Sequence, residues 1–77
     1  MDSLSDETRN IGNEYYKKYT KNQYQLINQS NLTTAIKYYE EAFKLSRTFE
    51  EKYKAQKNIG LSYEKLMETY DFGTKYQ

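Results

Sequence analysis

The chain contains no cysteine and no histidine among its 77 residues. Without cysteine it can form neither a disulfide framework nor a thiolate metal site. Without histidine it lacks the commonest general base and metal ligand. An enzyme made from this sequence would depend on carboxylates, lysine or tyrosine, and adjacent acids such as Glu40 and Glu41 point to different sides of a helix. We therefore expect a non-catalytic protein with no metal and no cofactor.

Valine and proline are also absent, and no apolar run exceeds two residues. The lack of valine argues against a β-rich fold, and the lack of proline leaves helices unbroken. Runs this short exclude a membrane-spanning helix and the apolar segment of a signal peptide. The net charge of +1 offers no electrostatic footprint for nucleic acid or for an anionic membrane. The expected protein is soluble and intracellular, in the cytoplasm or a similar compartment.

The sequence does contain apolar residues at helical spacing, in three blocks. These blocks predict helices over approximately 5–27, 32–46 and 49–70, followed by a frayed tail over 71–77. Candidate caps stand near the start of each helix: Ser3 or Ser5, Ser30 or Asn31, and Thr48 with Glu51 in a capping-box pattern. The prediction is therefore an all-α fold, a three-helix antiparallel bundle that forms a single domain over 1–77.

Two of the three glycines lie inside the same short sequence motif, N-I-G-x-x-Y, at Gly12 and again at Gly60. A glycine inside a helix costs roughly 1 kcal/mol against alanine, but its missing Cβ lets a neighbouring helix approach closely. The second block supplies matching small residues, because Ala35 and Ala42 flank Tyr39 on one face. This alternation of small and large residues is typical of a tightly packed antiparallel helix pair.

The same residues resemble the tetratricopeptide repeat (TPR), whose signature is W-x2-L-G-x2-Y, then A-x3-F and often P. The first copy of the motif, at Gly12, matches the first helix of that repeat, and the Ala-Tyr-Ala trio matches its second helix. The second copy, at Gly60, matches the first helix of a next repeat, so the resemblance covers roughly residues 8–70. The tryptophan positions hold Thr8 and Gln56, and the proline position holds Arg47. The two copies of the motif are 48 positions apart, whereas the TPR period is 34, so the match requires insertions. The second repeat stops after one helix.

The resemblance implies a concave surface that is lined by first helices and binds peptide segments. The residues expected on it are Arg9, Asn10, Asn13 and Tyr16 from the first helix, and Lys57, Asn58 and Leu61 from the third. Some TPR proteins clamp the terminal carboxylate of chaperone tails there, and Arg9, Asn13 and Asn58 resemble three clamp positions. Asparagine at these positions also serves purely structural hydrogen bonding in that family, and the basic pair of a third repeat is missing here.

The third helix has no following helix to cover it, so part of its apolar face lacks a partner within the chain. That face is expected to carry Leu61, Leu66, Met67 and Tyr70. An exposed apolar patch marks an interaction surface, and tyrosine suits one because it is large, rigid and polar at one end. Alternatively, the long first helix folds across and covers the patch itself.

These observations favour a protein–protein interaction module, a small TPR-like adaptor or accessory subunit that docks on a protein partner in a larger assembly. Self-association is a further expectation. The alternative is a free-standing peptide-binding module, either a chaperone-tail clamp or a helix-groove binder similar to the MIT domain, although Gly60 falls where that family prefers a large apolar residue. The residues expected to contact a partner are Arg9, Asn13, Tyr16, Asn58, Leu61, Leu66, Met67 and Tyr70.

Overall fold

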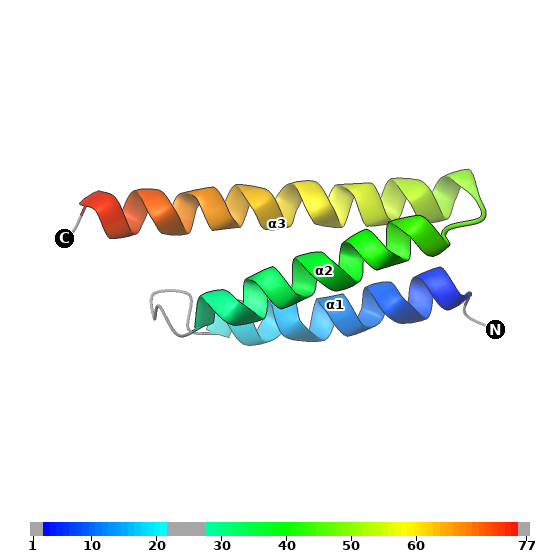
Figure 1. The fold of residues 1–77 in the computed structure, drawn as a ribbon, viewed down its shortest axis with the longest axis horizontal. Helices are drawn as coiled ribbons and strands as arrows, with labels where there is room; N and C mark the ends of the chain where they lie inside the picture. The colour runs from blue at the N-terminus through cyan, green and yellow to red at the C-terminus, as the bar shows by residue number, and fades with distance from the viewer. Residues whose placement is uncertain (1–2, 22–27, 76–77) are drawn as a thin grey trace.

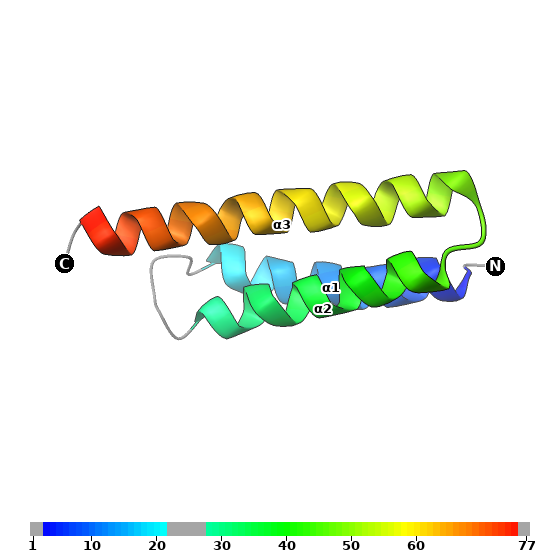
Figure 2. The same cartoon turned by 45° about the horizontal axis from the view of Figure 1, so that its top comes forward.

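The computed structural model describes residues 3–21 and 28–75, with side chains described up to Glu68. Within those residues the chain forms three helices: α1 (Leu4–Lys21), α2 (Gln29–Leu45) and α3 (Phe49–Lys75). Successive helices run in opposite directions, and both α1 and α3 pack against α2 (Figures 1 and 2). The prediction of an all-α, three-helix antiparallel bundle is confirmed.

The helix bounds differ from the expected ones at several ends. The described part of the first helix ends at Lys21, and the predicted continuation over 22–27 lies outside the described residues. The second helix begins earlier than expected, at Gln29. The third continues to Lys75 through the expected tail, because a single Gly73 costs only roughly 1 kcal/mol against alanine and no proline follows it. At 1.5 Å per residue α3 is about 40 Å long, and its C-terminal end projects past the start of α2 (Figure 1).

The starts of α1 and α2 use their polar residues differently. Ser3 caps α1, since its hydroxyl accepts a hydrogen bond from the Asp6 backbone N–H at 3.1 Å. The other candidate, Ser5, is 2% exposed and donates to the Ala42 carbonyl of α2 at 2.8 Å. The expected cap at Ser30 or Asn31 is wrong: the residue before α2 is Asn28, which makes no side-chain cap bond. The helix has already begun at those positions.

Glu51 ties the start of α3 to the start of α1. Thr48 caps α3 as expected, accepting from the Glu51 N–H at 3.1 Å. The Glu51 carboxylate accepts from the Arg47 N–H at 3.1 Å, one residue earlier than a capping box would place it. The pKa of Glu51 is lowered chiefly by this Arg47 bond, and next by the Ser3 hydroxyl. One carboxylate therefore binds groups at two helix ends.

The apolar core lies mostly on α2. Tyr19 of α1 packs there with Leu32 and Ile36 of α2, and Tyr16 and Leu66 cover the edge of this cluster. Further along α2, three more side chains are at most 1% exposed: Ala35, Tyr39 and Ala42. The helix is thus buried from both sides, by α1 and by α3.

Gly12 of α1 lies in close contact with α2. A Cβ added there would lie 2.7 and 2.8 Å from two carbons of the Tyr39 ring and 3.2 Å from the Ala35 carbonyl oxygen. Real Cβ atoms do not approach other atoms that closely, so only glycine fits. At Gly60, in the second copy of the N-I-G-x-x-Y motif, an added Cβ would meet nothing within 4 Å. The expected close packing at a glycine therefore occurs at the first copy, and the second is open.

This difference predicts opposite effects for one substitution made at the two glycines. Gly12→Ala should lower the free energy of unfolding by about 1–2 kcal/mol, because the new methyl group must displace a buried ring. Gly60→Ala should raise it by up to about 1 kcal/mol through helix propensity alone. Urea unfolding followed by circular dichroism at low protein concentration measures both. A Gly12→Ala variant as stable as the wild-type chain would contradict the contact with Tyr39, and a loss of stability in Gly60→Ala would contradict the open space there.

The lowered pKa of Glu51 predicts a specific loss of stability in acid. Because its folded-state pKa lies below the ordinary value of 4.5, its contribution is present above that value and disappears as the pH falls through the folded-state pKa. The melting temperature should therefore drop more between pH 7 and pH 3 in the wild-type chain than in Glu51→Gln. All other carboxylates titrate in both proteins and cancel in the comparison. Equal drops would show that the Glu51 bonds contribute nothing.

Candidate functional site

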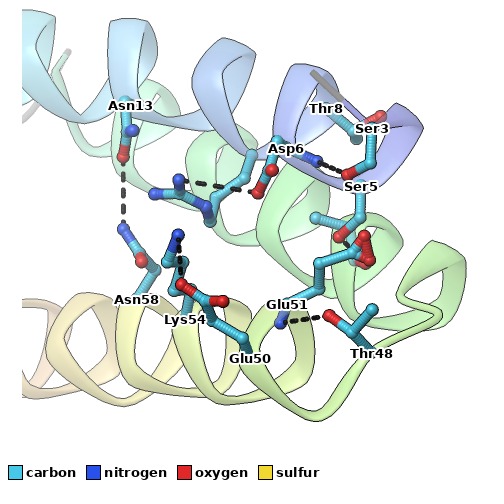
Figure 3. Close-up of polar contacts among 12 residues, drawn as sticks. Ser3, Ser5, Asp6, Thr8, Asn13, Thr48, Glu50, Glu51, Lys54 and Asn58 are labelled. Atoms are coloured by element: carbon cyan, nitrogen blue, oxygen red, sulfur yellow. Dashed lines mark hydrogen bonds and ion pairs between the residues drawn. The ribbon is translucent and has the colours of Figure 1, made fainter. Parts of the chain in front are cut away.

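The first candidate surface is the polar layer between α1 and α3. Figure 3 shows Asn13 of α1 pointing toward Asn58 of α3 across this space. Closer to the N-terminal ends of the two helices, Arg9 lies 3.8 Å from Asp6 on α1, and Lys54 lies 3.2 Å from Glu50 on α3. Each cation of the layer thus has an acid on its own helix. The resemblance to a peptide-binding repeat places Arg9, Asn13 and Asn58 here, and the structure brings all three together.

Asn13 already has two partners within the chain. Its side-chain oxygen accepts from the Tyr39 hydroxyl at 2.7 Å and from the Asn58 amide at 3.2 Å. The Tyr39 side chain is 1% exposed, and burial raises the pKa of its hydroxyl, which keeps it a neutral donor. These bonds join all three helices at one point. The arrangement supports the structural interpretation of the two asparagines, because the Asn58 amide donates to Asn13 within the chain.

Tyr16 and Leu66 face the core instead of a partner. Both pack against the cluster of Tyr19, Leu32 and Ile36. The Tyr16 ring lies 6.4 Å from the Tyr19 ring, between centroids, and burial raises the pKa of the Tyr16 hydroxyl, although the nearby Lys65 charge opposes this shift. Substitution at either position would therefore alter the fold as well as any surface.

The second candidate surface is a line of exposed residues on α3 that faces away from α2. Its large side chains are 87% exposed at Phe49, 60% at Tyr53, 45% at Tyr63 and 68% at Met67. Gln56 and Gly60 complete the line and are also exposed. We call these six residues the outer stripe. Large exposed apolar groups gathered on one line of a helix indicate an interaction surface.

The outer stripe follows a regular spacing of four and three residues. This is the spacing of the a and d positions in a coiled coil, where one face of a helix packs along a second helix. Leu61 is 48% exposed but lies about 100° further round the helix than Gly60. Tyr70 continues the spacing of the stripe, and its side chain is outside the described residues.

Sequence reasoning missed three of the four large side chains on this surface: Phe49, Tyr53 and Tyr63. The missing signal is the position of small residues on the same helix. Ala55 and Ser62, seven residues apart, are both fully buried against the rest of the bundle. They mark the inner face of α3, so the large apolar residues at the other heptad positions must point outward. Of the four residues expected on the uncovered face, Leu66 packs against the core, Leu61 and Met67 are exposed, and the side chain of Tyr70 lies outside the described residues.

No group of three or more acidic residues in the described chain lies close enough to hold a metal ion. None of the helices formed by the described residues has both the length and the apolar content needed to cross a membrane. Comparisons with models of protein families, with curated proteins and with solved structures found no match. The functional interpretation therefore depends on the two surfaces themselves.

The polar layer predicts a graded response to asparagine substitution. Asn13→Ala should cost about 1–3 kcal/mol of unfolding free energy, because the buried Tyr39 hydroxyl loses its acceptor. Asn58→Ala should cost less, about 0.5–1.5 kcal/mol, since Asn13 still holds Tyr39. Asn10→Ala is the matched control on the exposed side of α1 and should have little effect. Equal losses at Asn13 and Asn10, measured by urea unfolding, would contradict a structural role for this layer.

Proposed function

We propose that this chain is a non-catalytic protein–protein interaction module, a small TPR-like adaptor or accessory subunit that docks on a protein partner through the outer stripe of α3. The observation that carries the proposal is the exposure of Phe49, Tyr53, Tyr63 and Met67 on one line of a helix. Burying such side chains against a partner is worth roughly 1.5–3 kcal/mol for each large apolar group. A cytoplasmic or other soluble intracellular location belongs to the proposal and rests on a chain without cysteine.

The polar residues of the described chain support a non-catalytic role. Glu50 pairs with Lys54 at 3.2 Å, and Lys65 pairs with Glu68 at 3.3 Å. The most buried carboxylate, Glu51, is 9% exposed and binds backbone at a helix start. These three acids therefore have structural uses, in ion pairs along α3 or at its start.

The packing around the two glycines supports the TPR-like part of the proposal. Gly12 receives Tyr39 from the following helix, in the manner that the small-large-small pattern favours. Gly60 occupies the same position in the second copy of the motif and has open space beside it. In an array of repeats the next helix would fill that space. A partner helix in that position would contact this glycine, on which none of the described residues packs.

The alternative is a peptide-binding module in the polar layer between α1 and α3. It depends on Arg9, Asn13 and Asn58 being available to a ligand. Arg9 lies near Asp6, with its side chain 20% exposed, and the two asparagines bind each other. The outer stripe offers more surface without displacing any bond within the chain, so we favour it.

Variants that carry a new lysine test the proposal in cells that express the full chain with an epitope tag. Tyr63→Lys and Met67→Lys should remove the tagged chain from a complex larger than its 9.3 kDa, seen by size-exclusion chromatography of the extract. Ile11→Lys is the matched control, because Ile11 is 44% exposed against 45% for Tyr63. It lies on α1, away from the stripe, and should leave the complex intact.

Circular dichroism of each purified variant must show unchanged helicity, so that loss of the complex reports the surface. A complex that survives both stripe variants would overturn the proposal. A complex that survives them but disappears in Arg9→Ala would favour the peptide-binding alternative.

A further inference from the structure

We propose that the outer stripe of α3 is covered by the outer stripe of a second copy of this chain, with the two α3 helices antiparallel. The inference rests on the proposed function and names the partner at the same surface. It is argued from three features of the described residues: the spacing of the stripe, the open space at Gly60, and the charges along its edge.

The spacing of the stripe suits a helix partner of similar length. Phe49, Tyr53, Gln56, Gly60, Tyr63 and Met67 alternate four and three residues apart, which keeps one seam facing a second helix. From Phe49 to Met67 the seam is about 27 Å long. The face of α2 that carries Tyr39 cannot serve as the cover from another copy, because it is already buried within the bundle. Among the described residues, the stripe of α3 is a long apolar line that a second copy leaves exposed.

Gly60 has the space that a tyrosine of the other copy needs. Within one chain, the antiparallel pair of α1 and α2 already packs a tyrosine ring directly on Gly12. If the twofold axis passes between the two α3 helices at the level midway between Leu61 and Ser62, Gly60 of each copy lies opposite Tyr63 of the other. The symmetric interface then contains this glycine–tyrosine contact twice, because a twofold interface repeats each contact. In the same register, Gln56 lies opposite Met67 of the other copy.

The charges beside the stripe favour the antiparallel arrangement. Lys57 and Glu64 follow Gln56 and Tyr63 and are exposed along one edge of the stripe. In the register just described, Lys57 of each copy lies beside Glu64 of the other, so opposite charges meet twice. A parallel pair would instead bring Lys52 beside Lys57 of the other copy, where like charges repel. A net charge of +1 per chain adds little general repulsion between copies.

Single cysteine variants test both the partner and the direction, since the natural chain has no competing thiol. Gln56→Cys and Met67→Cys, mixed and mildly oxidised, should form the mixed disulfide in preference to either symmetric one, as read by intact mass. Symmetric disulfides at both positions would indicate a parallel pair and overturn the proposal. Lys37→Cys, on an exposed part of α2, is the control and should cross-link no more than free diffusion allows.

Sedimentation equilibrium from low micromolar to near-millimolar concentration measures the association itself. The wild-type chain should reach a dimer, and Gly60→Gln should weaken the dimer at least tenfold by filling the space for Tyr63. The same substitution should leave the dilute monomer as helical as before or more so, because glutamine is the better helix former. This combination separates a surface effect from a folding effect.

The outcomes of the two experiments keep the two proposals apart. A helical wild-type monomer up to near-millimolar concentration would overturn the second copy as occupant. If the complex in cells still required Tyr63 and Met67, the docking function would stand with a different protein on the stripe. A purified dimer that Tyr63→Lys and Gly60→Gln both leave intact would place self-association elsewhere and overturn the inference.

Discussion

The bundle depends on the contact between Gly12 and the ring of Tyr39. Because Gly12 has no Cβ, the backbone of α1 can come close enough for the ring to lie directly on it. That position sets the Tyr39 hydroxyl 2.7 Å from the Asn13 oxygen. The same oxygen accepts from Asn58 of α3. One close approach between two helices therefore also fixes the third.

The position of α2 determines how the rest of the surface is divided. It packs against both α1 and α3, and its small and aromatic residues are buried in those two contacts. On α3 the side toward the bundle carries Ala55 and Ser62, whose small side chains allow close packing. The large apolar residues of that helix consequently lie on its other side, in water. Stability and recognition thus use different faces of the same helix, and this separation allows either to be altered alone.

The two copies of the N-I-G-x-x-Y motif differ in their surroundings and therefore have different roles. In α1 the glycine is buried and the following Tyr15 stacks on Tyr38, with ring centroids 5.7 Å apart. In α3 the glycine is open and Tyr63 is 45% exposed. A glycine in a helix costs roughly 1 kcal/mol in helix propensity. In the first copy, the packing of the Tyr39 ring on Gly12 offsets this cost. In the second copy, no described residue packs on the glycine to offset this cost.

The sequence by itself determined the three helices, the Thr48 cap and the close packing of the first two helices at a glycine. These follow from periodicity, capping chemistry and side-chain size, which act over a few neighbouring residues. Tertiary structure decided that Leu66 turns inward, that Asn13 and Asn58 bind each other, and that Phe49, Tyr53 and Tyr63 remain outside. Periodicity places apolar residues along lines on a helix. Which line is buried depends on where small residues let a second helix approach, and that is a property of the helix pair.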